Sequence, residues 1–141
     1  MAYEDPAAAE QAFYDAFRQL DLAQMKEVWM DSDDASCIHP GGELLQGSEA
    51  ILKSWAAMFN DSMPPRVDHR LIQASSDNHL AVHTVEEKVS SGAGHRRAII
   101  LATNIYAWAS DGWRLLAHHA SLPLVETTRD PPEEPETGKL H

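Results

Sequence analysis

The first sixty residues of the chain place their apolar side chains at helical spacing. Asp5-Pro6 is typical of a helix start, because an acidic N-cap precedes proline at the first helical position. Asp21 is placed to cap a second, short helix, and Gly47-Ser48 begins a third. The pattern therefore predicts three helices, with apolar faces made by Ala9, Phe13, Ala16, Phe17 and Leu20, by Leu22, Met25, Val28 and Trp29, and by Ile51, Trp55, Met58 and Phe59.

After Met63-Pro64-Pro65 the pattern changes to strand-like runs separated by turn residues. The predicted strands cover residues 67–75, 79–90, 95–109 and 113–123, and a shorter one covers 35–39 before Pro40-Gly41-Gly42. Because the four later strands are joined by short connections, consecutive strands should pair antiparallel. The predicted fold class is α+β, with three N-terminal helices packed on a curved antiparallel sheet.

The chain length of 141 residues, of which 43% are hydrophobic, is that of a single domain. We assign residues 1–125 to this domain. Residues 126–141 contain five acids, two bases and three prolines with almost no apolar side chains. Such a segment buries too little apolar surface to offset its ordering entropy, so it is predicted to be an acidic, proline-rich flexible tail.

The charge balance excludes some classes of partner. The formal net charge is -11, from 22 acids and 11 bases, which argues against nucleic acid and against anionic membrane surfaces. No apolar stretch is long enough to cross a bilayer, and the N-terminus lacks the features of a signal peptide, so we expect a cytoplasmic protein. A single cysteine, Cys37, excludes a disulfide framework and a cysteine-rich zinc module.

Several segments of the chain resemble those of a known family. These segments are residues 36–42, 45–51, 102–106, 111–115 and 118–121, together with Trp55. Over residues 6–123 the chain resembles the nuclear transport factor 2-like superfamily, and within it the SnoaL-like group of polyketide cyclase and ketosteroid isomerase-like proteins. The resemblance implies a cone-shaped α+β fold with a deep pocket between the concave face of the sheet and the helices. It also implies a homodimer that forms through the sheet.

His39 is the first candidate for chemistry. The resemblance places it where ketosteroid isomerases have an acid followed by proline that serves as general base. Histidine titrates near neutral pH and can move a proton in this role. Alternatively, His39 holds the adjoining glycine loop through bonds to the backbone.

Asn104 interrupts an otherwise apolar strand, so its amide must find hydrogen-bond partners. The resemblance implies an oxyanion donor from this part of the sheet, and the amide of Asn104 is suited to donate there. A structural amide is the alternative.

His118 and His119 are adjacent on a strand, so they point to opposite faces. A three-residue loop before Trp113 would place His118 opposite Asn104, and a two-residue loop would place His119 there. We favour His119 for the pocket, which makes His39, Asn104 and His119 the candidate catalytic residues.

Aromatic side chains should form the wall of the pocket. The resemblance implies a tyrosine on the first helix, and that register holds Phe13 with Tyr14 beside it. The candidate substrate-binding residues are Phe13, Tyr14, Trp29, Trp55 and Tyr106. In Glu86-Glu87 one carboxylate should face solvent and the other should face inward, where it could orient His39 or a substrate.

These observations leave three functions open. The first is an isomerase- or lyase-type enzyme that acts by acid–base catalysis on a hydrophobic carbonyl or polyketide-like molecule. The others are a non-catalytic domain that binds a small apolar ligand, and a dimeric structural or interaction protein. No metal and no cofactor is expected, because no H-E-x-x-H motif is present and His79 and His83 are about 13 Å apart along a strand. The alternative is a three-histidine metal site made by His39, His83 and either His118 or His119.

Overall fold

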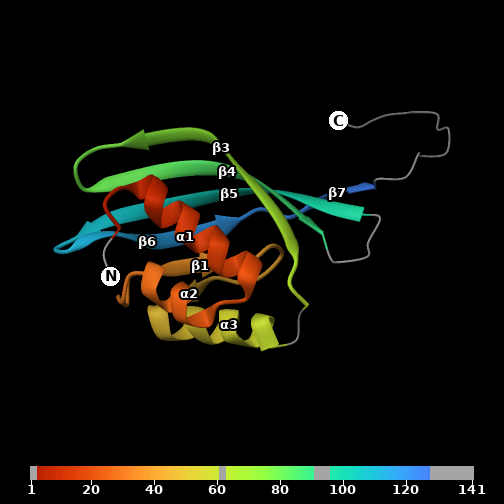
Figure 1. Ribbon diagram of the computed structural model, residues 1–141, viewed down its shortest axis with the longest axis horizontal. Helices are drawn as coiled ribbons and strands as arrows, with labels where there is room; N and C mark the ends of the chain where they lie inside the picture. The colour runs from red at the N-terminus through yellow and green to blue at the C-terminus, as the bar shows by residue number, and fades with distance from the viewer. Residues whose placement is uncertain (1–2, 61–62, 91–95, 128–141) are drawn as a thin grey trace.

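The computed structural model describes residues 3–60, 63–90 and 96–127, and its elements follow the predicted order (Figure 1). The helices are α1 (Pro6–Gln19), α2 (Leu22–Val28) and α3 (Ser48–Asn60). The strands are β1 (Ser36–Ile38), β2 (Leu45–Gln46), β3 (Arg66–Ser76), β4 (Leu80–Ser90), β5 (Arg96–Ala109), β6 (Gly112–Ala120) and β7 (Leu124–Thr127). No helix in these ranges has both the length and the apolar character needed to cross a membrane.

The two N-terminal helices begin where their caps predict. The Asp5 side chain accepts a hydrogen bond from the backbone N–H of Ala8 at 2.7 Å, ahead of proline in the first turn. Asp21 does the same for Gln24 at 3.0 Å. Leu20, between the helices, adopts the left-handed conformation that ends α1. The sharp stop folds α2 back against α1.

The strands form a mixed sheet in the order β2-β1-β6-β5-β4-β3, with β7 paired to the start of β5. The run from β3 to β6 is antiparallel throughout, as the short connections predict. β1 instead lies parallel to β6, and no hairpin links these two strands. A pair joined through helices is free to adopt the parallel direction. The α+β prediction is confirmed, and the sheet is mixed rather than wholly antiparallel.

All three helices lie on one side of the sheet, and α1 lies closest to it (Figure 1). The concave side of the sheet carries the alternate residues of each strand, such as Ala81, Val85 and Tyr106, which are fully buried. The core between the two layers is dominated by large side chains, including Phe13, Trp29, Trp55, Met25 and Leu115.

The register of β5 and β6 decides which histidine faces the helices. Ala109 pairs with Gly112 across a two-residue turn, and a β-bulge at Leu116 then shifts the pairing by one residue. Beyond the bulge Asn104 lies opposite His118. His119 lies opposite Thr103, on the other face. The preference for His119 as the partner of Asn104 was therefore wrong, because the bulge adds a residue that a regular hairpin lacks.

The predicted last strand is interrupted. β6 ends at Ala120, and β7 begins at Leu124 and runs to Thr127, two residues into the predicted tail. β2 was also not predicted. The remainder of the predicted tail, residues 128–141, lies outside the described residues.

Candidate functional site

A buried carboxyl group lies on the concave face of the sheet, beneath α1. Glu87 of β4 is 2% exposed, and the hydroxyl of Tyr14 on α1 donates a hydrogen bond to its Oε2 at 2.6 Å. Burial raises the pKa of Glu87 from 4.5 to about 7, with a further rise from the charge of Glu10, while the bond from Tyr14 acts in the opposite direction. Burial likewise holds the pKa of Tyr14 well above 10, so the phenol stays protonated and donates.

Asn104 joins Tyr14 to His118. Its Nδ2 donates to the Tyr14 hydroxyl at 3.1 Å, and its Oδ1 lies 2.6 Å from Nδ1 of His118. Because an amide oxygen only accepts, His118 carries its proton on Nδ1. Asn104 thereby fixes both the tyrosine hydroxyl and the histidine tautomer.

His118 is neutral in this environment. It is 2% exposed, and burial lowers its pKa to about 3, helped by the nearby His39 and His119. Its unprotonated Nε2 faces Oε2 of Glu87 at 3.9 Å. This contact is not an ion pair, since the imidazole is uncharged at neutral pH. A carboxyl group that titrates near neutral pH thus faces an imidazole nitrogen that stays unprotonated.

A second buried polar cluster lies beside the first. Oε1 of Glu10 on α1 accepts from the Tyr106 hydroxyl at 2.9 Å and lies 2.9 Å from Nδ1 of His83. Glu10 and His83 are each 5% exposed, and Tyr106 is fully buried. Burial holds the pKa of Tyr106 well above 10. The two clusters together place buried carboxyl, phenol and imidazole groups along one strip of the sheet.

His69 of β3 covers the Tyr14 ring, with 4.2 Å between ring centroids in a stacked arrangement. Nη1 of Arg18 lies 3.2 Å from Nδ1 of His69 and donates to the carbonyl of Val67 at 2.8 Å. Burial and the Arg18 charge lower the pKa of His69. These contacts hold α1 against the edge strand and close the network on that side.

His39 does not join the Asn104 network through any described hydrogen bond. Its Nε2 lies 2.9 Å from Oγ of Ser54, which itself donates to the carbonyl of Ile51 at 2.6 Å. The hydroxyl therefore accepts from His39, which ties the histidine to α3. The Trp55 ring packs against His39 at 4.8 Å and against His118 at 6.3 Å, and it stands between the two.

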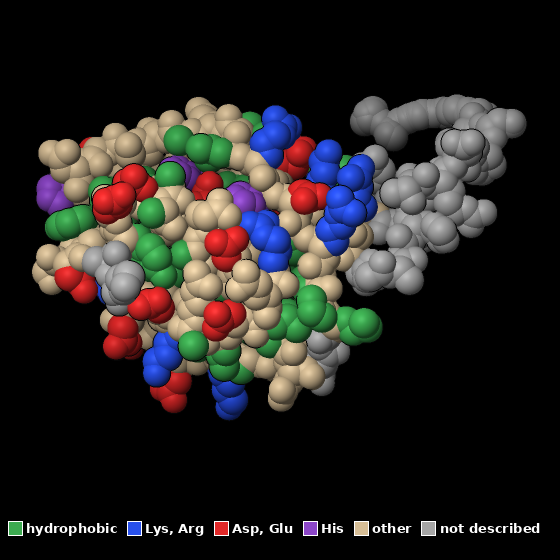
Figure 2. Space-filling model, in the orientation of Figure 1, with side chains coloured by type: hydrophobic (Ala, Val, Ile, Leu, Met, Phe, Trp, Pro, Cys, Tyr) green, Lys and Arg blue, Asp and Glu red, His purple; other side chains and the backbone are tan. Residues whose placement is uncertain are grey.

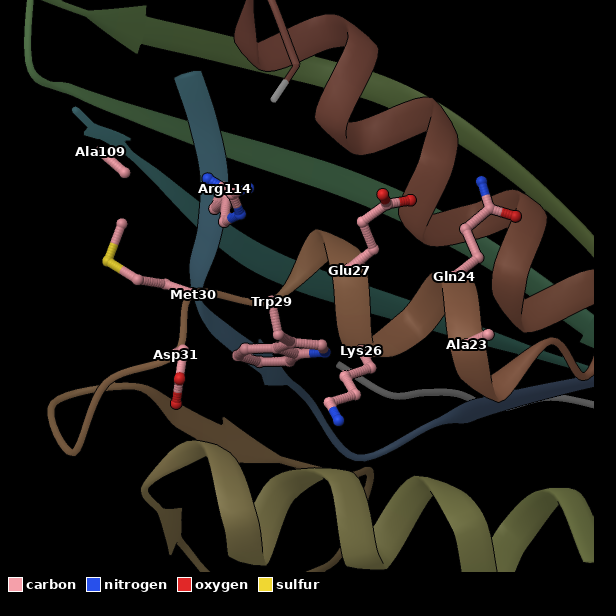
Figure 3. A pocket seen from close by; sticks show the side chains of 9 residues that line it. All are labelled: Ala23, Gln24, Lys26, Glu27, Trp29, Met30, Asp31, Ala109 and Arg114. Atoms are coloured by element: carbon pink, nitrogen blue, oxygen red, sulfur yellow. The ribbon is translucent and has the colours of Figure 1, made fainter. Parts of the chain in front are cut away.

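The five aromatic residues predicted to line a pocket are all buried in the core. The Phe13 ring packs against the rings of Trp29, Trp55 and His118 at centroid distances of 6.4, 5.6 and 5.0 Å. The deep pocket expected between the sheet and the helices stays a prediction. A cavity with a volume of about 760 Å³ lies beside α2, and none of the residues of either polar cluster line it (Figure 3).

Of the predicted catalytic residues, the structure therefore places Asn104 in the buried network, His39 beside it and His119 on the opposite face. Glu10, His83 and His118 are members that the sequence analysis did not select as catalytic, and Glu87 was only weighed. Alternation along β4 was an available signal, because His83 and Glu87 share a face with Ala81 and Val85. In the described ranges no group of three His, Cys, Asp or Glu side chains is placed to hold a metal ion.

The helical side of the molecule carries acidic side chains spread over its surface, and basic ones mostly toward the end where β7 lies (Figure 2). Basic side chains near that end touch one another in this view, and others lie at its lower edge.

Comparison with known proteins relates this architecture to one family. A family model described as SnoaL-like domain matches residues 7–125. F-box protein SKIP8 of Arabidopsis thaliana is 25% identical over 114 residues, which are 81% of this chain and 48% of that protein. The chain thus spans about half the length of this curated relative.

Solved structures share the fold across most of the chain. A candidate calcium/calmodulin-dependent protein kinase type II association domain from Thiobacillus denitrificans is 35% identical, with a TM-score of 0.82 over 88% of this chain and 98% of that one. A candidate dehydratase of the NTF2-like family from Streptomyces avermitilis is 29% identical, with a TM-score of 0.74 over 82% of this chain and 91% of that one. A ketosteroid isomerase-like protein from Erwinia carotovora atroseptica, at 13% identity and a TM-score of 0.66, covers 82% of this chain and 91% of its own, and it shows the fold alone.

Proposed function

Because the chain belongs to the SnoaL-like domain family, whose fold it has, we propose that it acts on a small, apolar carbonyl or polyketide-like molecule by acid–base chemistry without a cofactor. One observation carries the proposal. Glu87 is a buried carboxyl group with a pKa of about 7, hydrogen-bonded to a protonated phenol and facing an unprotonated imidazole nitrogen. A group that titrates near the working pH is suited both to take and to give a proton.

The residues divide the work as follows. Glu87 takes the proton from the carbon next to a carbonyl. The Tyr14 hydroxyl, which donates to Glu87 in the ligand-free site, turns its one hydrogen to the oxygen on which charge develops. Asn104 positions Tyr14 and His118. In this proposal His118 has the role beside Asn104 that the sequence analysis assigned to His119. His39 is half-buried and packs on the Trp55 ring, so in this proposal it contacts the ligand on the Trp55 side of the site.

The Trp55 side chain is evidence for a ligand that carries a hydrogen-bond acceptor. It is 1% exposed, and its Nε1 is buried without a hydrogen-bond partner among the described residues. An unsatisfied buried donor costs free energy that an acceptor on the ligand would recover. A planar apolar ligand would displace the half-buried rings of Phe17 and Phe59, which pack on Trp55 at 5.2 and 5.7 Å.

Proton exchange tests the proposal without knowledge of the product. A panel of cyclic ketones and β-keto esters is incubated with the protein in D2O, and loss of the α-proton signal is followed by NMR. We expect catalysed exchange for at least one compound, and a fall of about 100-fold or more in Glu87→Gln. Glu86→Gln is the matched control, because this neighbour faces Arg70 on the other side of the strand. Exchange that is equal in both variants, or absent for the whole panel, contradicts the catalytic proposal.

A binding domain without chemistry is distinguished in the same samples. Its signature would be a ligand-dependent shift of the Trp55 indole resonance with no proton exchange.

A second candidate function is association with a second copy of the chain. Val82 and Leu101 lie on the face of the sheet away from the helices and are 40% and 52% exposed. Exposed apolar groups on neighbouring strands favour a protein contact there. The similarity to a candidate association domain points the same way. Light scattering tests it, since a mass of about 16 kDa at high concentration would contradict a dimer of the 15.6 kDa chain.

A further inference from the structure

A separate cleft lies between α2 and α3, on the side of the helices away from the Glu87 network. Its volume is about 470 Å³, within the range of small-ligand sites. Leu22 of α2 and Leu52 of α3 give it apolar sides, and Trp29 lines it as well. Trp29 also lines the larger cavity of Figure 3, so the two hollows meet at this residue.

Trp29 brings an unused donor to this cleft. Its side chain is 1% exposed, and its Nε1 is buried with no hydrogen-bond partner among the residues described. The indole nitrogen lies at the end of the ring next to Lys26 (Figure 3). Buried indole N–H groups usually find an acceptor. The nitrogen is closed off from solvent, so an acceptor from outside reaches it only when the neighbouring side chains move aside.

The charged groups around the cleft are of both signs. Lys26 lines it on the α2 side, and within the described part of the chain its ammonium makes no ion pair. Asp31 and Glu49 line it on the side of α3, and Oδ1 of Asp31 accepts from the Ser48 hydroxyl at 3.0 Å. Donors therefore cluster near Trp29, and carboxylates face them across the cleft.

We propose that this cleft binds an α-amino acid with an aliphatic side chain. The ligand carboxylate accepts from the Trp29 indole and from Lys26, in a charge-assisted arrangement. The ligand ammonium meets Asp31 and Glu49, and its side chain lies between Leu22 and Leu52. A simple anion is disfavoured by the net charge of -11, whereas a zwitterion brings no net charge into this field.

The test follows the indole N–H resonances of the protein labelled with ¹⁵N-tryptophan. On titration with leucine to about 10 mM, we expect a saturable downfield shift of the Trp29 signal and an unchanged Trp55 signal. Leucinamide, which lacks the carboxylate, and 4-methylpentanoate, which lacks the ammonium, should each bind about tenfold more weakly or worse. Absence of a Trp29 shift, or equal binding of all three compounds, overturns the proposal.

Two lysine variants give an independent check that does not disturb the core. Lys26→Ala should weaken leucine binding about tenfold. Lys53→Ala is the matched control, because Lys53 is exposed on α3 but does not line this cleft. Equal leucine affinity in the two variants overturns the role of Lys26. Since no residue is shared with the Glu87 network, failure here leaves the acid–base proposal standing, and the reverse also holds.

Discussion

Each face of the sheet carries side chains that depart from the usual distribution of polar and apolar groups. The concave face, buried under the helices, carries Glu87, Asn104 and His118, and each has a defined partner. The opposite face carries Val82 and Leu101, each at least 40% exposed. Ordinary strands of this kind place apolar groups inside and polar groups outside.

This difference between the two faces separates a candidate site for chemistry from a candidate surface for association. Buried polar groups are costly unless they are hydrogen-bonded, so the fold depends on an intact network, and a buried strip with titratable groups in it is a candidate for chemistry. Exposed apolar groups outside point to a partner surface. The following substitutions test this contrast by changing neighbouring residues that face opposite sides.

The largest effect is expected for Asn104→Leu. This change keeps the branching and the number of side-chain heavy atoms but leaves His118 and Tyr14 without their amide partner in a buried site. We expect the free energy of unfolding to fall by about 4 kcal/mol, measured by urea denaturation. The control is Thr103→Ala on the exposed face, which should cost less than about 1 kcal/mol. Similar losses in the two variants would show that the network is not closed in solution.

Glu87→Gln should change how stability depends on pH. The folded pKa of about 7 exceeds the usual 4.5, so this group favours the folded state fully below pH 4.5. That contribution is lost as pH rises through 7, a difference of about 3 kcal/mol at ~1.4 kcal/mol per pH unit.

The low pKa of His118 acts in the opposite sense. Folding opposes protonation of this imidazole, so stability falls as the pH drops from 6.5 toward 3. Between 4.5 and 6.5 the two groups offset each other, and the native chain should show a shallow profile there. In Glu87→Gln only the effect of His118 remains, so the free energy of unfolding should rise with pH across this range. Glu86→Gln should follow the profile of the native chain. Urea denaturation across this range would contradict the assignment if both variants gave the same slope.

The sequence predicted the fold because its signals are local. The caps at Asp5 and Asp21 begin helices where expected, and the turn residues divide the later chain into strands that pair in order. β1 is the exception. Its parallel pairing with β6 depends on how the chain crosses between distant elements, which no local pattern encodes.

The site was predicted less well because it depends on small shifts of register. The bulge at Leu116 exchanges the faces of His118 and His119, and only the consecutive pair Leu115-Leu116 hints at it. On α1 a broad arc of the helix is buried, so Phe13 and Tyr14 both point inward and no choice between them was needed.

The exposed face is tested by Leu101→Lys. If this face joins two copies, a buried charge should weaken the dimer about tenfold or more while the folding of each chain is little changed. Leu44→Lys is the control, because Leu44 is 56% exposed but lies outside the strands. Sedimentation equilibrium measures both. Equal dissociation constants for the two variants would show that the contact lies elsewhere.

The smallest effect is expected at His119. Its one described hydrogen bond, between Nε2 and Oγ of Ser36 at 2.9 Å, is exposed to solvent. His119→Ala should therefore cost less than about 0.5 kcal/mol in the isolated chain, whereas His118→Ala should cost about 3 kcal/mol because it opens a cavity and leaves Asn104 without its partner. Urea denaturation of the two variants at low protein concentration compares neighbouring residues of one type, so the difference between them measures only the face that each occupies. A larger loss of stability for His119→Ala than for His118→Ala would show that His119, and not His118, faces the helices.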